Sequence, residues 1–203
     1  MREINIKLYT FDELSSSAKS RAWEEWASTT EEFTDNDEYR ATLEAFEKLF
    51  DVKVYRWCVD ENHYNYRFSH IREAPEGDWL RFAKWVWNNY GEAIQQGKYY
   101  GKLVYREGMH PRHVKRYSKA TVEYTCNLTG FVADMDITDP VWKCIHYKEK
   151  YTTYDELIEA CLESFFEAWR NAMEYETSIY YFEELCELNE WEFTEYGEMW
   201  RGI

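Results

Sequence analysis

The chain has 203 residues, of which 24 are Lys or Arg and 39 are Asp or Glu, so its formal charge is −15. With 45% hydrophobic residues, eight Gly and three Pro, it is too apolar for a disordered acidic tail and too poor in turn residues for an all-β sandwich. The excess of acid argues against direct binding of nucleic acid, because attraction to phosphate needs a basic surface.

The first residues, MREINIKLYTF, lack the apolar run of a signal peptide, and no later run reaches the roughly 18 apolar residues of a membrane span. We therefore expect a cytoplasmic protein with no membrane contact. The five cysteines stand at wide spacings without a C-x-x-C pair, which favours buried free thiols over a zinc or redox site.

The front part of the chain alternates between helical and strand periodicity. The spacing of apolar residues predicts, in chain order, a strand at Glu3–Tyr9, helices at 16–27 and 37–50, a hairpin that pairs Val52–Val54 with Tyr64–Phe68, and a helix from Trp79 that fades near Gly91. Trp79, Trp85 and Trp87 of the last helix cannot all face the core, so we expect an exposed aromatic patch for a protein partner.

After residue 97, clear signals of secondary structure are found mainly near the end of the chain. In residues 98–150 we predict only strands at Ala120–Asn127 and Phe131–Met135. Thr153 and Glu156 then form a capping box that opens a long helix with an apolar stripe. A helix at Ile179–Asn189 and a small hairpin at 191–200 follow. The fold class is α+β in a single domain, with an α/β front part (1–97), a basic, irregular or strand-containing middle (98–150) and an acidic helical end (151–203).

Acidic residues recur at helical spacing in the end part. On the long helix they stand four residues apart, about 6 Å from one to the next, with no Lys or Arg between them. Like charges at this spacing repel, so a face selected only for stability would normally mix the signs. Such rows resemble the phosphates of a nucleic acid, although a merely solubilising surface is the alternative. The candidate partner-binding residues are Asp155, Glu159, Glu163, Glu167, Glu183, Glu184, Glu187 and Glu190.

One short segment has the opposite charge. Residues 98–120 contain seven Lys or Arg and one Glu, and the stretch REGMHPRHVKRYSK places Arg112, Lys115 and Arg116 beside Tyr117. Basic groups interleaved with aromatic rings can bind single-stranded nucleic acid. The same residues can instead clamp the protein's own acidic helices, or contact those of a second copy in a homodimer.

A metal-dependent hydrolase is a third hypothesis. His110 and His113 are three residues apart, and Asp134, Asp136 and Asp139 follow, so a mixed His/Asp site can be drawn. Pro111 disturbs the helix that would align the histidines, and the aspartates lack the glycine and glutamate of a calcium loop. No other catalytic motif is found, and we therefore expect no enzyme activity, no metal and no cofactor.

Four stretches, YTFDELSSSAK, EYRATLEAFEKLFDVKVYRW with the following YNYRF, CNLTGFVADMDI and NEWEFTEYG, resemble a family of small acidic proteins encoded by bacteriophages and mobile elements of Firmicutes. Some of its members are labelled antitoxin-like, and their gene setting resembles that of anti-defence genes, including anti-CRISPR proteins. The resemblance implies a defence-blocking role without a catalytic motif. The basic segment at 106–119 departs from the family pattern.

Together these features predict an anti-CRISPR-like inhibitor that binds a nucleic-acid enzyme of bacterial defence, such as a CRISPR effector nuclease, through acidic mimicry of nucleic acid. The alternatives are a nucleic-acid-binding accessory module that uses segment 106–119, and an antitoxin-like protein-binding module.

Overall fold

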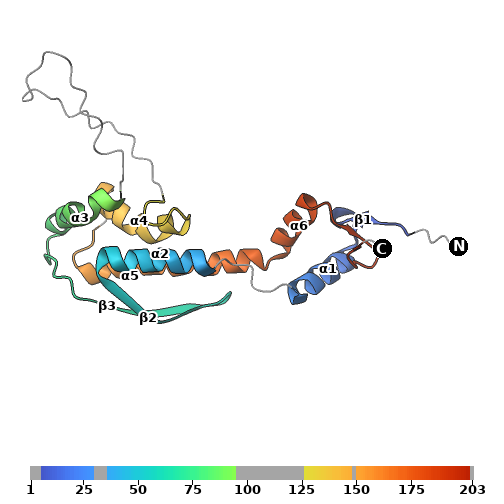
Figure 1. Cartoon of the computed structure of the whole chain (residues 1–203), viewed down its shortest axis with the longest axis horizontal. Coiled ribbons are helices and arrows are strands. Elements are labelled where there is room, and N and C mark those ends of the chain that lie inside the picture. Colours follow the sequence, from blue (N-terminus) through green and yellow to red (C-terminus); the bar gives the residue numbers. More distant parts are fainter. Residues whose placement is uncertain (1–5, 30–35, 95–125, 148–149, 202–203) are drawn as a thin grey trace, which may run out of the picture. The chain divides into compact units, whose positions relative to one another are not determined.

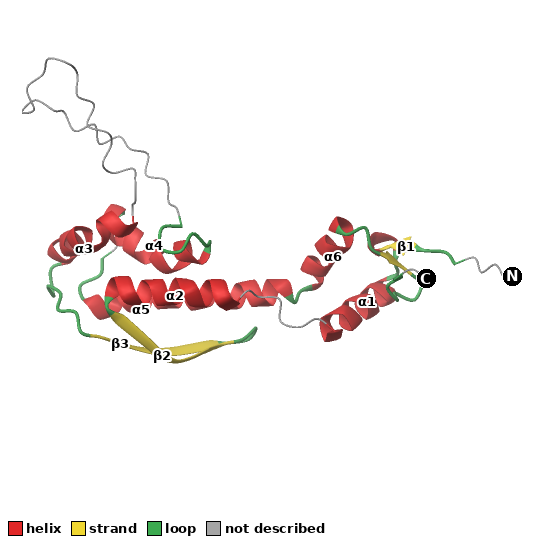
Figure 2. Ribbon diagram, viewed as in Figure 1, coloured by secondary structure: helices red, strands yellow, loops and turns green. Residues whose placement is uncertain are grey.

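A computed structural model describes residues 6–29, 36–94, 126–147 and 150–201. The fold is α+β, as predicted, with helices that carry most of the residues and two small antiparallel sheets (Figure 2). The elements are β1 (Tyr9–Thr10), the 3-10 helix η1 (Phe11–Glu13), α1 (Ser16–Thr29), α2 (Asn36–Phe50), β2 (Val52–Val59), β3 (Tyr64–His70), α3 (Trp79–Ile94), α4 (Ala133–His146), α5 (Tyr154–Glu176), α6 (Ile179–Leu188) and β4 (Glu192–Phe193).

The chain forms two compact units, each described here by itself. The terminal unit contains Met1–Thr34, Asp60–Asn62 and Arg170–Ile203, and the central unit contains Asp35–Val59 and His63–Trp169. Helix α5 therefore contributes its first sixteen residues to the central unit and its end to the terminal unit. The single domain with three consecutive parts stays a prediction.

The terminal unit is built around a small aromatic core. Phe11 meets Phe182 edge to face, with ring centroids 5.2 Å apart, while Ala18 and Ala22 of α1 are small enough to let the helix approach these rings. Strand β1 pairs with β4, and the predicted C-terminal hairpin is present, since Phe193 bridges to Met199. A strand was predicted at 3–9, but residues 6–8 are not in a strand, because β4 has only two residues that pair with β1. Residues 1–5 lie outside the described residues.

The central unit packs helices and a hairpin around α5. Figure 1 shows α2 and α5 between the β2–β3 hairpin and the pair α3 and α4. Trp169 of α5 stacks on Tyr39 of α2 at 4.9 Å, and Phe166 stacks on Tyr66 of β3 at 5.1 Å. Phe50 of α2 stacks on Tyr90 of α3 at 4.3 Å. Successive turns of α5 therefore bury aromatic rings against α2 and against the hairpin.

The helices at both ends of the chain, the hairpin β2–β3 and the α5 capping box are confirmed. The Thr153 hydroxyl accepts a hydrogen bond from the Glu156 backbone at 3.2 Å, and the Glu156 carboxylate accepts one from the Thr153 backbone at 3.2 Å. Two N–H groups that would lack partners in the first turn of α5 are thereby satisfied.

The strand predicted at Phe131–Met135 is wrong, because this segment opens α4. The buried carboxylate of Asp134 accepts hydrogen bonds from the backbone N–H groups of Leu128, Thr129 and Gly130 at 2.8, 2.7 and 3.0 Å. A strand would use these three backbone N–H groups to pair with a neighbouring strand, but here they bond to Asp134 within the loop. The loop also needs a φ of +99° at Gly130, a conformation that glycine adopts without strain. Most of the strand predicted at 120–127 lies outside the described residues.

Candidate acidic binding surface

The carboxylates predicted on the long helix form one exposed row on α5. Asp155, Glu159, Glu163 and Glu167 are all solvent-exposed, whereas the residues between them include the fully buried Leu157, Ile158, Cys161, Leu162, Phe165 and Phe166. The apolar stripe therefore fixes the rotation of α5 in the core, and this rotation directs the carboxylates to solvent. We call these four residues the α5 row.

Strand β3 holds part of the α5 row in place. The Tyr64 hydroxyl donates a hydrogen bond to one Glu163 oxygen at 2.5 Å, and the Tyr66 hydroxyl donates to the other at 3.1 Å. His70 Nε2 lies 2.9 Å from Asp155 Oδ1, at the other end of the strand. Two of the four carboxylates are therefore oriented by partners on a neighbouring element.

The β3 partners of the α5 row were not predicted. Tyr64, Tyr66, Phe68 and His70 alternate with exposed residues and lie half-buried on one face of β3. This period of two was visible in the sequence as a strand signal. Nothing in the sequence shows that this face of β3 meets α5, because that pairing is made by tertiary contacts such as the one between Tyr66 and Phe166.

The α5 row keeps its negative charge. In the part of the chain that the structure describes, no Lys or Arg forms an ion pair with any of its four carboxylates. Burial and the hydrogen bond to Glu163 raise the pKa of Tyr66, so that the phenol stays protonated and acts as the donor. Tyr66 thus orients Glu163 without neutralising it.

The second predicted row lies on α6, in the terminal unit. Glu184 and Glu187 are exposed there, Glu190 is exposed in the turn just after the helix, and Glu183 is half-buried with its carboxylate 4.0 Å from Lys19 of α1. Glu184 accepts a hydrogen bond from the Tyr175 hydroxyl at 2.8 Å. The eight predicted residues therefore form two rows, one in each unit, and the row on α6 is partly compensated by a cation.

The other candidate residues of the sequence stay largely untested. Arg112, Lys115, Arg116 and Tyr117 lie outside the described residues, as do His110 and His113. The described part of the chain contains no group of three or more His, Cys, Asp or Glu residues that could hold a metal.

Asp134, which the metal hypothesis used, has a structural role instead. Its carboxylate also accepts hydrogen bonds from the hydroxyls of Thr129, at 2.7 Å, and Thr42, at 3.0 Å. Burial alone would raise the pKa of Asp134, but the hydrogen bonds from Thr129, Gly130 and Thr42 lower it. With five donors around it, this carboxylate holds the start of α4 to α2.

No family model, no curated protein and no solved structure matches the chain. The resemblance to acidic mobile-element proteins therefore stays a prediction. In the described ranges, none of the helices combines the length and the apolar composition needed to cross a membrane.

Proposed function

We propose that the protein is a non-enzymatic inhibitor from a phage or mobile element, which binds a nucleic-acid enzyme of bacterial defence and occupies its nucleic-acid channel. A nucleic-acid-guided nuclease is the target class that fits best. The observation that carries this proposal is the α5 row, four exposed carboxylates at regular spacing with no Lys or Arg paired to them among the described residues.

The α5 row resembles a run of phosphates in both charge and order. One helical turn separates neighbouring carboxylates by about 6 Å along the axis, and the row spans about 18 Å. A basic channel that attracts the closely spaced phosphates of a nucleic acid would attract this row as well. Long-range attraction of this kind speeds association and makes it sensitive to salt.

Rigidity favours a mimic over a merely solubilising surface. Solubility requires charge but no fixed geometry, whereas binding improves when the charged groups are ordered before the partner arrives. Glu163 is fixed by Tyr64 and Tyr66, and Asp155 by His70. The helix itself is anchored by the buried rings of Phe165, Phe166 and Trp169.

The experiment is a pull-down with the tagged full-length chain from a bacterial lysate rich in defence systems, eluted once with duplex DNA and once with salt. We expect DNA to release a nucleic-acid enzyme, because the duplex and the α5 row compete for one channel. Retention of nucleic acid itself, or an enzyme that salt releases and DNA does not, would contradict channel occupancy.

The variant for this experiment is Glu159→Lys/Glu167→Lys. Both side chains are exposed, and unlike that of Glu163 their carboxylates have no hydrogen bond to β3 among the described residues. Glu159 accepts one from Tyr66 only through its backbone carbonyl, at 3.4 Å, which the substitution keeps, so the reversal should leave the fold intact. The matched control, Glu24→Lys/Glu76→Lys, makes the same charge change at two exposed positions that do not belong to the α5 row. We expect the first variant to lose the enzyme and the control to retain it; equal retention would exclude the α5 row as the contact surface.

A further inference from the structure

Strands β2 and β3 contain no Asp or Glu, although 39 of the 203 residues of the chain are acidic. Side chains of a strand alternate between its two faces, and the register pairs the exposed residues of one strand with those of the other. Tyr55, for example, lies opposite Arg67. We call the exposed set the hairpin face. It consists of Lys53, Tyr55, Arg56, Cys58, Asn65, Arg67 and Ser69.

The charge of the hairpin face comes from Arg56 and Arg67. Lys53 is compensated, because its Nζ lies 2.8 Å from Glu47 Oε2. Among the described residues, no carboxylate forms an ion pair with Arg56 or Arg67. Two guanidinium groups therefore stand beside the exposed Tyr55 ring without a counter-charge.

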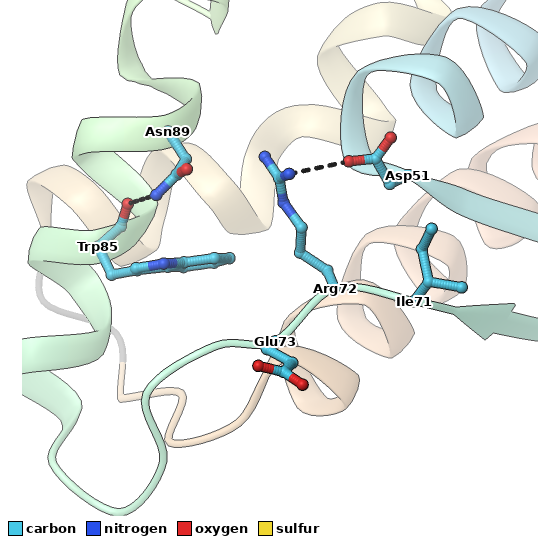
Figure 3. Close-up of a pocket in the computed structure, with 6 residues that line it drawn as sticks. All are labelled: Asp51, Ile71, Arg72, Glu73, Trp85 and Asn89. Carbon is cyan, nitrogen blue, oxygen red and sulfur yellow. Dashed lines mark hydrogen bonds and ion pairs between the residues drawn. The ribbon is translucent and has the colours of Figure 1, made fainter.

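The cation in the pocket of the central unit differs, because it is engaged within the chain. Figure 3 shows this residue, Arg72, with its contact to Asp51. Its Nη1 lies 3.1 Å from Asp51 Oδ2, and its Nε donates a hydrogen bond to the Tyr90 hydroxyl at 3.3 Å. Arg72 therefore has its counter-charge inside the fold, unlike the two arginines of the hairpin face.

Arg56 occupies a β-bulge in a strained conformation. Arg56 and Trp57 of β2 together oppose one residue of β3, Tyr66, and the φ of Arg56 is +51°. The bulge keeps Trp57 in the core, where its ring centroid lies 5.2 Å from that of Trp169. This role does not require arginine, because glycine adopts a positive φ without strain. A strained arginine at an exposed position therefore points to a use of its guanidinium at the surface.

The hairpin face and the α5 row lie on either side of β3. Tyr66 and His70 are half-buried on the side of α5, where they contact Glu163 and Asp155. Arg67 alternates with them and is exposed. It stands between Tyr66 and His70 in the strand, so it is level with the middle of the row. The row spans about 18 Å and the strand about 20 Å, so the two run side by side over their whole length.

We propose that the hairpin face binds the α5 row of a second copy of this chain, and that the two copies exchange this contact around a two-fold axis. Cations without a counter-charge then meet carboxylates without a cation. An axis level with Arg67 brings this residue of each copy to the middle of the other copy's row, where Glu159 lies, so both contacts form in one register. Tyr55 is buried between them, and Arg and Tyr are the side chains that most often anchor interfaces.

A single strand of nucleic acid is the other occupant that arginines beside a tyrosine suit. It fits less well, because the α5 row on the other side of β3 would repel its phosphates. A second copy presents a basic face to the row and an acidic row to the face. The formal charge of −15 on each copy opposes association, but at about 0.15 M salt charges more than about 8 Å apart are largely screened, so the pairs in contact decide.

The dimer does not rest on the proposed function, and its test needs no defence enzyme. Sedimentation equilibrium of the full chain at about 0.15 M salt should show a mass that rises with concentration to twice that of the monomer. If the proposed function also holds, the dimer covers the α5 row, so that only the monomer can enter a channel.

Three variants locate the contact. Arg56→Glu/Arg67→Glu should raise the dissociation constant of the dimer at least about tenfold, because like charges then face each other. Arg81→Glu/Lys84→Glu makes the same charge change at exposed positions of α3 and should leave the constant unchanged. Arg56→Gly removes the guanidinium together with the backbone strain. It should weaken the dimer severalfold without lowering the midpoint of thermal unfolding, which a merely structural role of Arg56 would not produce.

A mixture of two charge-reversed variants tests the pairing itself. Arg56→Glu/Arg67→Glu has two acidic surfaces and Glu159→Lys/Glu167→Lys has a basic face with a partly basic row, so each alone should be a monomer. Their equimolar mixture should form a dimer, because opposite charges meet at both contacts. A monomer at all concentrations of the unmodified chain, a dimer that keeps its affinity in Arg56→Glu/Arg67→Glu, or a mixture that stays monomeric overturns the proposal. Binding of a single-stranded oligonucleotide that Arg56→Glu/Arg67→Glu abolishes would assign the face to nucleic acid and overturn it as well.

Discussion

The Tyr66 hydroxyl of β3 donates a hydrogen bond to Glu163 Oε2 of α5 at 3.1 Å, although the two residues are 97 positions apart in the chain. The phenol is half-buried and its ring stacks on Phe166, so its position is set by the core. The packing of the core thereby fixes the orientation of a carboxylate at the surface. This contact distinguishes Glu163 from a freely rotating surface glutamate.

Removal of both hydroxyls that hold Glu163 should weaken binding without a change of charge. In Tyr64→Phe/Tyr66→Phe the rings stay in place but Glu163 loses two donors, which should lower the free energy of unfolding by about 1–2 kcal/mol. Retention of the target enzyme should fall severalfold, because the carboxylate must now be ordered on binding. Urea unfolding and the pull-down measure the two effects; full retention would show that the orientation of Glu163 is irrelevant.

Gly197 should tolerate no side chain. Its φ is +84°, and a Cβ built there would lie 2.2 Å from the backbone oxygen of Ala18, so Gly197→Ala should cost about 3 kcal/mol or more of stability. Gly77 has the same φ of +84° with nothing within 4 Å, so Gly77→Ala isolates the backbone strain and should cost only about 1–2 kcal/mol. Thermal unfolding of the two variants checks the difference; equal losses would contradict the close approach to Ala18.

Protonation of Asp134 in acid should lower the free energy of unfolding. Because its pKa in the fold lies below the ordinary 3.8, the ionised carboxylate stabilises the protein fully above that value and loses its effect as the pH falls through the folded pKa. Asp134→Asn should therefore lower the free energy of unfolding at pH 7 by about 2–4 kcal/mol and flatten its dependence on pH below 4. Urea unfolding between pH 7 and pH 2.5 measures both quantities.

Asp136 provides the control of opposite sign. Burial, together with repulsion from Asp139, raises the pKa of Asp136, so its ionised form is disfavoured in the fold and this effect fades as the pH falls. Asp136→Asn should leave stability at pH 7 unchanged or slightly increased. A loss as large as that of Asp134→Asn would contradict the roles assigned to both residues.

The five cysteines should react at different rates. Cys144, Cys161 and Cys186 are buried, and burial raises the pKa of Cys161 and brings that of Cys186 to about 12, so these thiols should react with a disulfide reagent only after unfolding. Cys58 is exposed and should give the fast phase, which Cys58→Ser should abolish. Three or more fast thiols in the native protein would contradict the packing around α5 and α6.

The sequence predicted those parts of the fold whose signals are local. The capping box of Thr153 and Glu156 and the apolar stripe from Leu157 to Trp169 located α5 and, with it, the four carboxylates of the α5 row. Free thiols were predicted correctly, and burial is confirmed for Cys144, Cys161 and Cys186, but Cys58 is exposed and Cys126 is only half-buried. The start of α4 was missed although four of the five hydrogen bonds to Asp134 come from residues 128–130, and only the one from Thr42, 92 residues earlier, is long-range.

The partners of the surface groups were beyond sequence reasoning for a similar reason. Tyr64 and Tyr66 belonged to the predicted strand and His70 did not, and only the packing of β3 on α5 brings the three residues to Glu163 and Asp155. Arg72 lies in a stretch without periodicity, so its position between Asp51 and Tyr90 follows only from tertiary structure.

The most direct measurement of the central claim is the inhibition of the recovered nuclease as a function of its DNA substrate concentration. If the α5 row occupies the nucleic-acid channel, inhibitor and substrate compete, so the inhibitor concentration for half inhibition should rise in proportion to substrate and inhibition should vanish for Glu159→Lys/Glu167→Lys. A half-inhibiting concentration that stays constant as DNA increases would show that the protein acts elsewhere on the enzyme and would contradict the mimic.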